Sequence, residues 1–392
     1  MRNNPEQLRA YLQSQQEQHL YRKPRLNESA QQPLMQIDGR QVLAFCSNDY
    51  LGLANHPGIV GALQCSAEKY GVGSGAAHLV NGHHIEHQRL EEALAEFTGR
   101  QRALLFSTGY MANLGVINAL TEKGDVIFQD RLNHASLIDG GRLSDATMWR
   151  YRHNDIADLS RRMAKSEAEN KLVVTDGVFS MDGDCAPLTE LATLTQQHQG
   201  WLMVDDAHGF GVLGKHGAGL VEQEGLNSDQ VPVLMATLGK AIGTAGAFVA
   251  GNDDLIEYLI QSARTYIFTT AMPPAVAAAT HYSLKVIQEE TWRREQLQSL
   301  IQRFKQGAAQ LGLPIMPSDT PIQPLLVGGS DQAMRYSLQL LEQGILVTAI
   351  RPPTVPDGEA RLRITITAGH SEVQIDQLLN ALESLQISKP IE

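Results

Sequence analysis

The chain has 392 residues, 43% of them hydrophobic and 19% charged, which is typical of a globular protein long enough for two domains. Its 43 acidic and 32 basic residues give a net charge of -11, which argues against nucleic-acid binding. No apolar run reaches the roughly 18 residues of a membrane-spanning helix, and the first residues do not resemble a secretory signal, so we expect a cytoplasmic protein.

Short apolar runs dominate the chain from about residue 50 onward, after an N-terminal arm with a weak helical stripe. Segments of helical length separate these runs, a rhythm typical of parallel strands joined by crossover helices. The runs are ALLF (103–106), DVIF (125–128), KLVVT (171–175), WLMVD (201–205), PVLMAT (232–237) and AFVA (247–250). The sequence therefore predicts an α/β domain built on a mostly parallel sheet.

The pattern changes after Pro273 and Pro274, where a long helix leads into strands and helices in mixed order. This rhythm predicts a compact α+β domain at the C-terminal end. We therefore predict three parts: an N-terminal arm and segment over residues 1–50, a large domain over 51–285, and a smaller domain over 286–392. The three cysteines are too few and too dispersed for a disulfide framework, and we expect them to be reduced and buried.

Polar side chains follow several of the predicted strands. Parallel sheets of this type bind ligands beyond the carboxyl ends of their strands, so these positions are the candidate site. They are Gly109 and Tyr110, His134, Ser180, Asp205 with His208, and Lys240. The small-residue turn before residue 111 leads into a predicted helix, whose free N–H groups suit a phosphate. A lysine flanked by a buried strand and glycines is unusual, because lysine prefers solvent.

This set of groups suits pyridoxal 5′-phosphate. The chemistry of that cofactor requires a lysine amine for the Schiff base, a carboxylate beside the pyridinium nitrogen, and donors for the phosphate and phenolate. Lys240 is the candidate amine and Asp205 the candidate carboxylate. A desolvated lysine beside a cation has a depressed pKa, so Lys240 also serves as a candidate general base.

Two other motifs point to different chemistry. The stretch HHIEH places His83, Glu86 and His87 in the order found in inverted zinc peptidases, although the following apolar stripe is typical of an ordinary surface helix. The stretch GFGVLG (209–214) has dinucleotide-binding spacing, but no helical pattern follows it. A zinc peptidase and a noncatalytic binding protein of the same fold remain alternatives.

Several motifs in order resemble the α-oxoamine synthases, and the similarity extends from about Arg22 to the last predicted helix. They are SNDYLGLANHP (47–57), TDGVFSMDGDCAPL (175–188), VDDAHGFGVLG (204–214), TLGKAIG (237–243) and TAIRPPTVP (348–356). The resemblance implies the fold type I architecture of pyridoxal-phosphate-dependent transferases and a homodimer with active sites at the subunit interface. It also implies an acyltransferase of biotin biosynthesis that condenses L-alanine with a pimeloyl thioester, carried by coenzyme A or by acyl carrier protein, and releases carbon dioxide. A family member that uses glycine and acetyl-CoA remains the alternative.

The resemblance also implies roles for individual residues. Lys240 resembles the Schiff-base lysine, Asp205 the pyridinium carboxylate, and His134 the imidazole that stacks on the cofactor and can donate to the developing oxyanion. Further cofactor contacts are implied for Gly109, Tyr110, Ser180, His208, Thr237, Thr269 and Thr270, the last two from the neighbouring subunit. Substrate contacts are implied for Arg363 and Asn48 (the amino-acid carboxylate) and for Arg22 and Thr354 (the acyl group), with no metal ion. Phe210 and the stretch 76–79 depart from the family pattern, so the resemblance does not define the acyl pocket of this chain.

Overall fold

The computed structural model describes residues 4–18, 20–385 and 387. These residues form two compact units. The larger unit comprises Asp49–Ser180 and Asp184–Glu295. The smaller unit contains the segment that ends at Asn48, the short segment Met181–Gly183, and the segment that begins at Gln296. The sequence-based boundaries near residues 50 and 285 remain a prediction.

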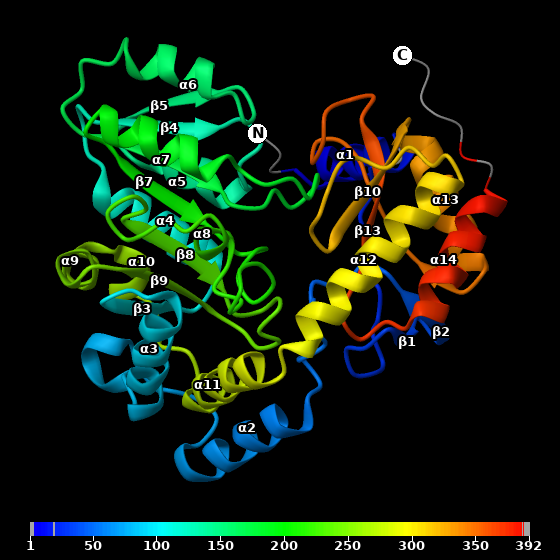
Figure 1. The fold of residues 1–392 in the computed structure, drawn as a ribbon, viewed down its shortest axis with the longest axis horizontal. Helices are drawn as coiled ribbons and strands as arrows, with labels where there is room; N and C mark the ends of the chain where they lie inside the picture. The colour runs from blue at the N-terminus through cyan, green and yellow to red at the C-terminus, as the bar shows by residue number, and fades with distance from the viewer. Residues whose placement is uncertain (1–3, 19, 386, 388–392) are drawn as a thin grey trace. The chain divides into compact units, whose positions relative to one another are not determined.

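A seven-stranded sheet forms the centre of the larger unit, with the strand order β3-β9-β8-β7-β6-β4-β5 (Figure 1). Neighbouring strands from β8 to β5 run parallel, whereas β9 is antiparallel to both β8 and β3. The strands are β3 (Arg102–Phe106), β4 (Val126–Asp130), β5 (Thr147–Tyr151), β6 (Lys171–Asp176), β7 (Trp201–Asp205), β8 (Val233–Thr237) and β9 (Ala247–Gly251). Six of them coincide with the six predicted apolar runs, which confirms the mostly parallel α/β fold.

Burial on both faces explains why these strands are visible in the sequence. Every residue of β4 and β9 is buried, and strands covered on both faces are nearly continuous apolar runs. The strand that the sequence analysis missed is β5, which lies at the sheet edge. Four of its five residues are exposed or only partly buried, so its apolar character is interrupted.

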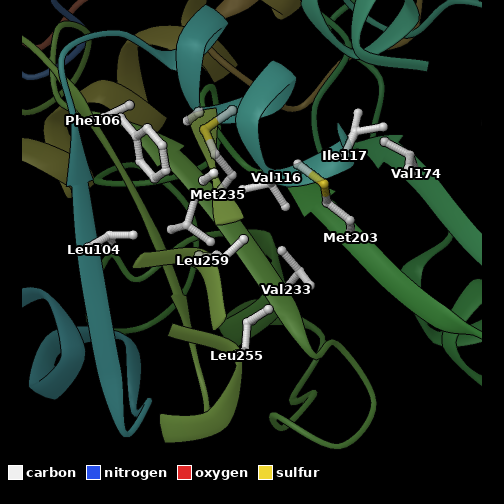
Figure 2. Close-up of a cluster of buried hydrophobic side chains, with 14 of the residues drawn as sticks. Leu104, Phe106, Val116, Ile117, Val174, Met203, Val233, Met235, Leu255 and Leu259 are labelled. Carbon is white, nitrogen blue, oxygen red and sulfur yellow. The ribbon is translucent and has the colours of Figure 1, made fainter. Parts of the chain in front are cut away.

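Helices cover both faces of this sheet, and the sheet divides the hydrophobic core of the unit into two clusters. Neighbouring residues of one strand join different clusters: Ile127 packs with the first, and Phe128 with the second. Figure 2 shows the first cluster, where side chains of α4 and α9 meet the strands. The helices of this unit are α2 (Pro57–Tyr70), α3 (Ile85–Thr98), α4 (Gly109–Leu120), α5 (Ala135–Leu143), α6 (Ile156–Met163), α7 (Leu188–Gln197), α8 (Leu220–Gln223), α9 (Asp253–Ser262), α10 (Arg264–Ile267) and α11 (Pro274–Glu289), with a π-helical turn η1 (His78–Gly82) before α3.

The smaller unit is the predicted α+β domain together with the N-terminal segment. It has two three-stranded sheets, β1-β2-β11 and β10-β13-β12. Their strands are β1 (Leu34–Ile37), β2 (Arg40–Ala44), β10 (Ile322–Gly328), β11 (Ile345–Leu346), β12 (Thr348–Ile350) and β13 (Ala360–Thr365). The helices are α1 (Pro5–Glu17), α13 (Ser330–Glu342), α14 (Glu372–Ser384) and most of α12 (Trp292–Gln310). The apolar run ILVTAI (345–350) forms two short strands, β11 and β12.

Among the described residues, no helix combines the length and the hydropathy needed to cross a bilayer. Among the described residues no disulfide joins the cysteines, as expected, but the expectation that they are buried is wrong for two of them. Cys65 and Cys185 are exposed, and Cys46 is partly buried.

Candidate active site

The carboxyl ends of β6 and β7 bring two buried carboxylates together in the larger unit. Asp176 and Asp205 are direct partners in the pairing of these two parallel strands, and their exposed fractions are 5% and 4%. Burial and the neighbouring charge of Asp205 raise the pKa of Asp176 well above its usual range. Asp205 is the last residue of β7, at the strand end where the sequence placed it, and its role at the cofactor stays a prediction.

A chain of hydrogen bonds connects Asp205 to His134. Asn113 on α4 donates from Nδ2 to Asp205 Oδ2 at 2.8 Å and to Ser136 Oγ at 2.9 Å. The Ser136 hydroxyl lies 2.7 Å from His134 Nδ1. The second carboxylate oxygen, Asp205 Oδ1, accepts from the Ala207 backbone N–H at 3.0 Å. Asp205 is therefore held in place by donors on both of its oxygens.

His134 is fixed in place at the beginning of α5, where it is the N-cap residue. Its backbone N–H donates to Asp176 Oδ2 at 2.6 Å, and its Nδ1 accepts from Ser136 N at 3.3 Å. Burial lowers the pKa of His134; the charge of Lys240 lowers it further, and that of Asp205 partly opposes the shift. A neutral imidazole at this position can lie against an aromatic ring without the cost of a buried charge.

The second aspartate of the VDDAH motif has a structural role. Asp206 is fully buried, and its Oδ2 accepts from the Leu220 backbone N–H at 2.6 Å. Burial raises its pKa to about 8. A Cβ at Gly209 or at Gly219 would lie within 2.1 Å of its carboxylate oxygens, so both glycines are needed for the loop to wrap around Asp206.

The turn from β3 into α4 has the features of a phosphate site. Thr108 caps the helix by accepting from Met111 N at 3.2 Å. A Cβ at Gly109 would lie 2.6 Å from Thr237 Cγ2, so only glycine allows the end of β8 to approach this turn so closely. The Thr237 hydroxyl is buried and has no hydrogen-bond partner among the described residues. A buried polar atom without a partner is costly, which indicates that Thr237 Oγ1 faces a ligand.

Tyr110 lies in the same turn, but its hydroxyl is already engaged. It donates to the Asp139 carboxylate, and 43% of the Tyr110 residue is exposed. Thr269 and Thr270 lie in the segment before α11, and the Thr270 carbonyl accepts from Ser107 Oγ at 3.4 Å, across from the end of β3. The structure thus places the backbone of Thr270 near the phosphate-type turn.

His208 and Lys240 occupy the loops that follow β7 and β8. His208 Nδ1 lies 2.6 Å from the hydroxyl of Tyr50, which is fully buried. In the Lys240 loop, Gly243 N donates to the Lys240 carbonyl at 2.8 Å. Gly243 has φ 73°, and a Cβ there would lie 2.6 Å from Ala54 N. The loop that carries Lys240 therefore requires a glycine three residues later.

Ser180 belongs to a tight turn after β6. Phe179 N donates to Asp184 O at 2.9 Å, and Ala186 N donates to Gly177 O at 2.8 Å, so the turn closes on itself. Ser180 is half-buried at its tip.

Four predicted residues belong to the smaller unit, where two of them are in contact. Arg363 on β13 lies with Nη1 and Nη2 each 3.3 Å from Asn48 Oδ1, and Nη1 also donates to Thr365 Oγ1 at 3.1 Å. Only 8% of Arg363 is exposed. Arg22 and Thr354 are both exposed.

Two residues near these positions were not identified from the sequence. Burial lowers the pKa of Arg351, and the positive charge of Arg22 lowers it further. Arg361, two residues before Arg363, pairs instead with Asp182 and with Glu359. Arg361 therefore has carboxylate partners within the protein, whereas Arg363 contacts Asn48 and Thr365.

The departure at Phe210 has a structural explanation. Its ring is 1% exposed and packs against Phe97 and Phe248, with centroids 5.6 and 5.0 Å apart. Phe210 is a core residue.

Comparison with known proteins connects this geometry to a family. The sequence model of "Aminotransferase class I and II" matches residues 40–382. The 8-amino-7-oxononanoate synthase of Pseudomonas putida (strain W619) is 62% identical, with 93% of each chain covered. The protein of the same name from Thioalkalivibrio sulfidiphilus is 59% identical over 96% of each chain.

Solved structures with a similar fold include two related enzymes. Serine palmitoyltransferase from Sphingomonas wittichii superposes with a TM-score of 0.92 at 34% identity, covering 98% of each chain. The 8-amino-7-oxononanoate synthase of Francisella tularensis gives a TM-score of 0.76 at 34% identity, covering 88% of this chain and 97% of that one. A serine palmitoyltransferase from S. paucimobilis, 32% identical with a TM-score of 0.91 and 96% of each chain covered, was solved with bound PLP and myriocin.

Proposed function

The chain belongs to the class I and II aminotransferase family, and from that premise we propose that it condenses L-alanine with a pimeloyl thioester. The products are 8-amino-7-oxononanoate, carbon dioxide and the free thiol carrier, in biotin biosynthesis. Relatives at about 60% identity over nearly the whole chain have the corresponding name. The structural observation that carries the proposal is the buried Asp205 carboxylate, linked through Asn113 and Ser136 to His134.

The residues of the larger unit fit pyridoxal 5′-phosphate as the cofactor. The buried Thr237 hydroxyl and the beginning of α4 at Gly109 supply donors for its phosphate. Asp205 supplies the carboxylate for the pyridinium nitrogen, and neutral His134 the ring for stacking. When bound, the cofactor withdraws electrons from the α-carbon of an amino acid, which stabilises the carbanion needed for carbon–carbon bond formation and for loss of carbon dioxide.

The residues of the chain then have distinct tasks. Lys240 Nζ holds the cofactor before alanine arrives, and afterwards takes the α-proton of alanine and returns a proton late in the reaction. Asn113 and Ala207 donate to the two oxygens of Asp205 and so orient its carboxylate toward the pyridinium nitrogen. His134 donates to the oxygen of the thioester carbonyl as charge develops there. Ser180 and His208 contact the phenolate oxygen, and the Tyr50 hydroxyl fixes the ring of His208.

Substrate binding is assigned to the smaller unit. Arg363, oriented by Asn48 and Thr365, binds the carboxylate of alanine with its guanidinium fork. Arg22 and Thr354 contact the acyl substrate. The positive charges of Arg22 and Arg351 favour an acyl group or carrier with negative charge, which fits both the terminal carboxylate of a pimeloyl chain and the phosphates of coenzyme A or of acyl carrier protein.

We expect the active protein to be a homodimer. Large apolar side chains are exposed on the larger unit at Val72, Leu79, Val80 and Phe268, with exposed fractions from 53% to 87%. Exposed apolar groups of this size are typical of an interface between subunits. Thr269 and Thr270 follow Phe268 directly, and we propose that their side chains reach the phosphate of the neighbouring subunit, while the Thr270 carbonyl contacts Ser107 of its own chain. Because alanine and acyl thioesters are intermediates of central metabolism, we place the reaction in the cytoplasm.

The experiment that tests the function is a substrate comparison with the purified full chain and pyridoxal phosphate. Mass spectrometry measures product from alanine with pimeloyl-CoA, alanine with pimeloyl-acyl carrier protein, and glycine with acetyl-CoA. The proposal predicts 8-amino-7-oxononanoate from at least one pimeloyl thioester and no product from the Lys240→Ala variant. Preferential turnover of glycine with acetyl-CoA would instead identify a 2-amino-3-ketobutyrate CoA ligase.

A further inference from the structure

Three histidines near the beginning of α3 lie close together in the larger unit. One ring nitrogen from each of His78, His83 and His87 lies within 4.8 Å of the others. The ring centroids are 5.0 to 5.6 Å apart in all three pairs, so each imidazole is a direct neighbour of the other two. We propose that these three histidines bind a divalent transition-metal ion, with zinc as the ion whose preferences they match.

The spacing of the nitrogens agrees with this assignment. A tetrahedral zinc ion with Zn–N bonds of about 2.0–2.1 Å holds its ligand nitrogens about 3.3 Å apart. The Nδ1 atoms of His78 and His83 are 2.9 Å apart, and the limit for the whole set is 4.8 Å. Small side-chain rotations therefore bring three nitrogens to the required distance. Three imidazoles leave a fourth position for water, and His83 is an exposed residue, so solvent reaches the cluster.

The backbone holds the three rings in this arrangement. His78 is the first residue of the π-helical turn η1, His83 is the residue that follows η1, and His87 lies in the first turn of α3. The ring of His78 stacks on Tyr266 with a centroid distance of 5.0 Å and an interplanar angle of 16°. His87 is fully buried, and its Nε2 donates to Met272 O at 2.7 Å. Two of the three rings are therefore oriented before any ion binds, which lowers the entropic cost of binding.

The hydrogen bonds of His87 show which of its two ring nitrogens is able to bind an ion. Because Nε2 of His87 donates to a carbonyl, its Nδ1 carries the lone pair, which accepts from His84 N at 2.9 Å. An ion bound at Nδ1 replaces that hydrogen bond.

Outer partners of the kind that orient metal-bound histidines are present. The Nδ1 atoms of His78 and His83 share one proton in a hydrogen bond. If both Nδ1 atoms bind the ion, this proton moves to the Nε2 atom of one of the two rings. His83 Nε2 lies 3.9 Å from Glu91 Oε2, and a carboxylate behind a ligating imidazole is a common second partner of zinc sites. The Met272 carbonyl has the same relation to His87.

The site differs from the zinc peptidase that the HHIEH motif suggested. In that reading Glu86 is the general base, but Glu86 Oε1 is paired with Arg89 Nη1 at 2.9 Å, and only 11% of the Glu86 side chain is exposed. The third ligand is His78, which precedes the motif by five residues. The geometry therefore points to metal binding without hydrolysis.

A bound ion would join three segments of the larger unit. The residues before η1 already contact the chain before α11, because Ala271 N donates to Ala76 O at 3.0 Å and Ala77 bridges to Thr270. His87 contacts the same chain at Met272. The ion would thus fix η1 to α3 and to the segment of Thr269 and Thr270. This inference does not depend on the proposed reaction.

The test is zinc binding to the full-length holoenzyme, purified without a histidine tag and stripped with a chelator. Isothermal titration calorimetry measures stoichiometry and affinity, and Co²⁺ replacement reports the geometry through its visible absorption above the cofactor band. The variants are His83→Gln and His78→Gln, with His198→Gln, at the end of α7, as the matched control. Because every variant carries the same cofactor, any metal held by the cofactor appears in all of them.

We expect one zinc ion per chain, a rise in the unfolding temperature with zinc, and tetrahedral cobalt absorption. His83→Gln and His78→Gln should weaken binding at least about tenfold, whereas His198→Gln should leave it unchanged. The proposal is overturned by the absence of saturable binding, or by equal affinity in His83→Gln and His198→Gln. If His78→Gln fails to fold, the exposed position of His83 still allows the comparison.

Discussion

Asn113 provides a sharp test of how the site controls Asp205. Its Nδ2 is the donor to Asp205 Oδ2 at 2.8 Å and to Ser136 Oγ at 2.9 Å, so it joins the carboxylate to the support of His134. In Asn113→Ala, a buried carboxylate oxygen loses its side-chain donor. A hydrogen bond to a charged group contributes about 1.5–3 kcal/mol. If this energy is expressed fully in the transition state, kcat falls about 10- to 150-fold.

The chain offers a matched control for this variant. Asn118 lies on the same helix and also donates twice through Nδ2, to Leu114 O at 2.9 Å and to Gly140 O at 3.0 Å, but it does not contact Asp205. Asn118→Ala therefore removes the same chemical group and has a comparable effect on α4. Asn113→Asp, which places a second carboxylate beside Asp205, should be more damaging than Asn113→Ala.

The assay combines steady-state kinetics with thermal unfolding of the holoenzymes. We expect similar losses of unfolding temperature in Asn113→Ala and Asn118→Ala, but a lower kcat only in the first. A kcat for Asn113→Ala within about twofold of that of Asn118→Ala would refute the role of Asn113 in positioning Asp205.

Three further results are expected. Gly109→Ala places a Cβ 2.6 Å from Thr237 Cγ2, so the cofactor should dissociate faster from this variant than from Gly99→Ala. If the two variants retain the cofactor equally in equilibrium dialysis, the phosphate site is not at this turn. Hydrogen bonds to Asp130 and Asp184 outweigh burial and raise the pKa of His153 from 6.5 to about 9. The protonated imidazole therefore stabilises the folded protein fully below pH 6.5, and this contribution disappears as the pH rises through 9. His153→Gln should therefore lower the free energy of unfolding by about 2–3 kcal/mol less at pH 10 than at pH 6. Urea titrations that show the same loss at both pH values would contradict this. Arg363→Ala should raise KM for alanine far more than KM for the acyl thioester, and equal increases would indicate a structural role.

The sequence predicted the fold well wherever burial is uniform. The strands β4, β6, β7, β8 and β9 are covered on both faces, so each is a continuous apolar run. The edge strand β5 contains Arg150 and an exposed Thr147, and its pattern does not differ from that of a loop. The short strands β11 and β12 merge in the sequence because no turn residue separates Leu346 from Thr348.

The same contrast applies to the site. Asp205, His208 and Lys240 directly follow strands, so the rule that ligands bind beyond strand ends was enough to select them. Asn113 and Tyr50 could not be selected in this way. Asn113 projects from the second turn of α4, and Tyr50 contacts a histidine 158 positions away. Both contacts depend on tertiary packing, which has no local signal in a single sequence.

The histidine cluster shows an intermediate case. His83 and His87 are four residues apart, a spacing that would place both on one face of a helix, although in the structure His83 lies just before α3. The third imidazole, His78, comes from a π-helical turn whose geometry is not visible in the sequence. The motif alone therefore suggested hydrolysis with Glu86, whereas the structure pairs Glu86 with Arg89.

The most direct measurement is the location of the cofactor on the chain. The holoenzyme is reduced with borohydride and digested, and the labelled peptide is sequenced by mass spectrometry. We predict a single pyridoxyl label on Lys240, in the peptide that follows β8, and none in the Lys240→Ala variant. A label on any other lysine, or no label on a yellow protein, would contradict the account.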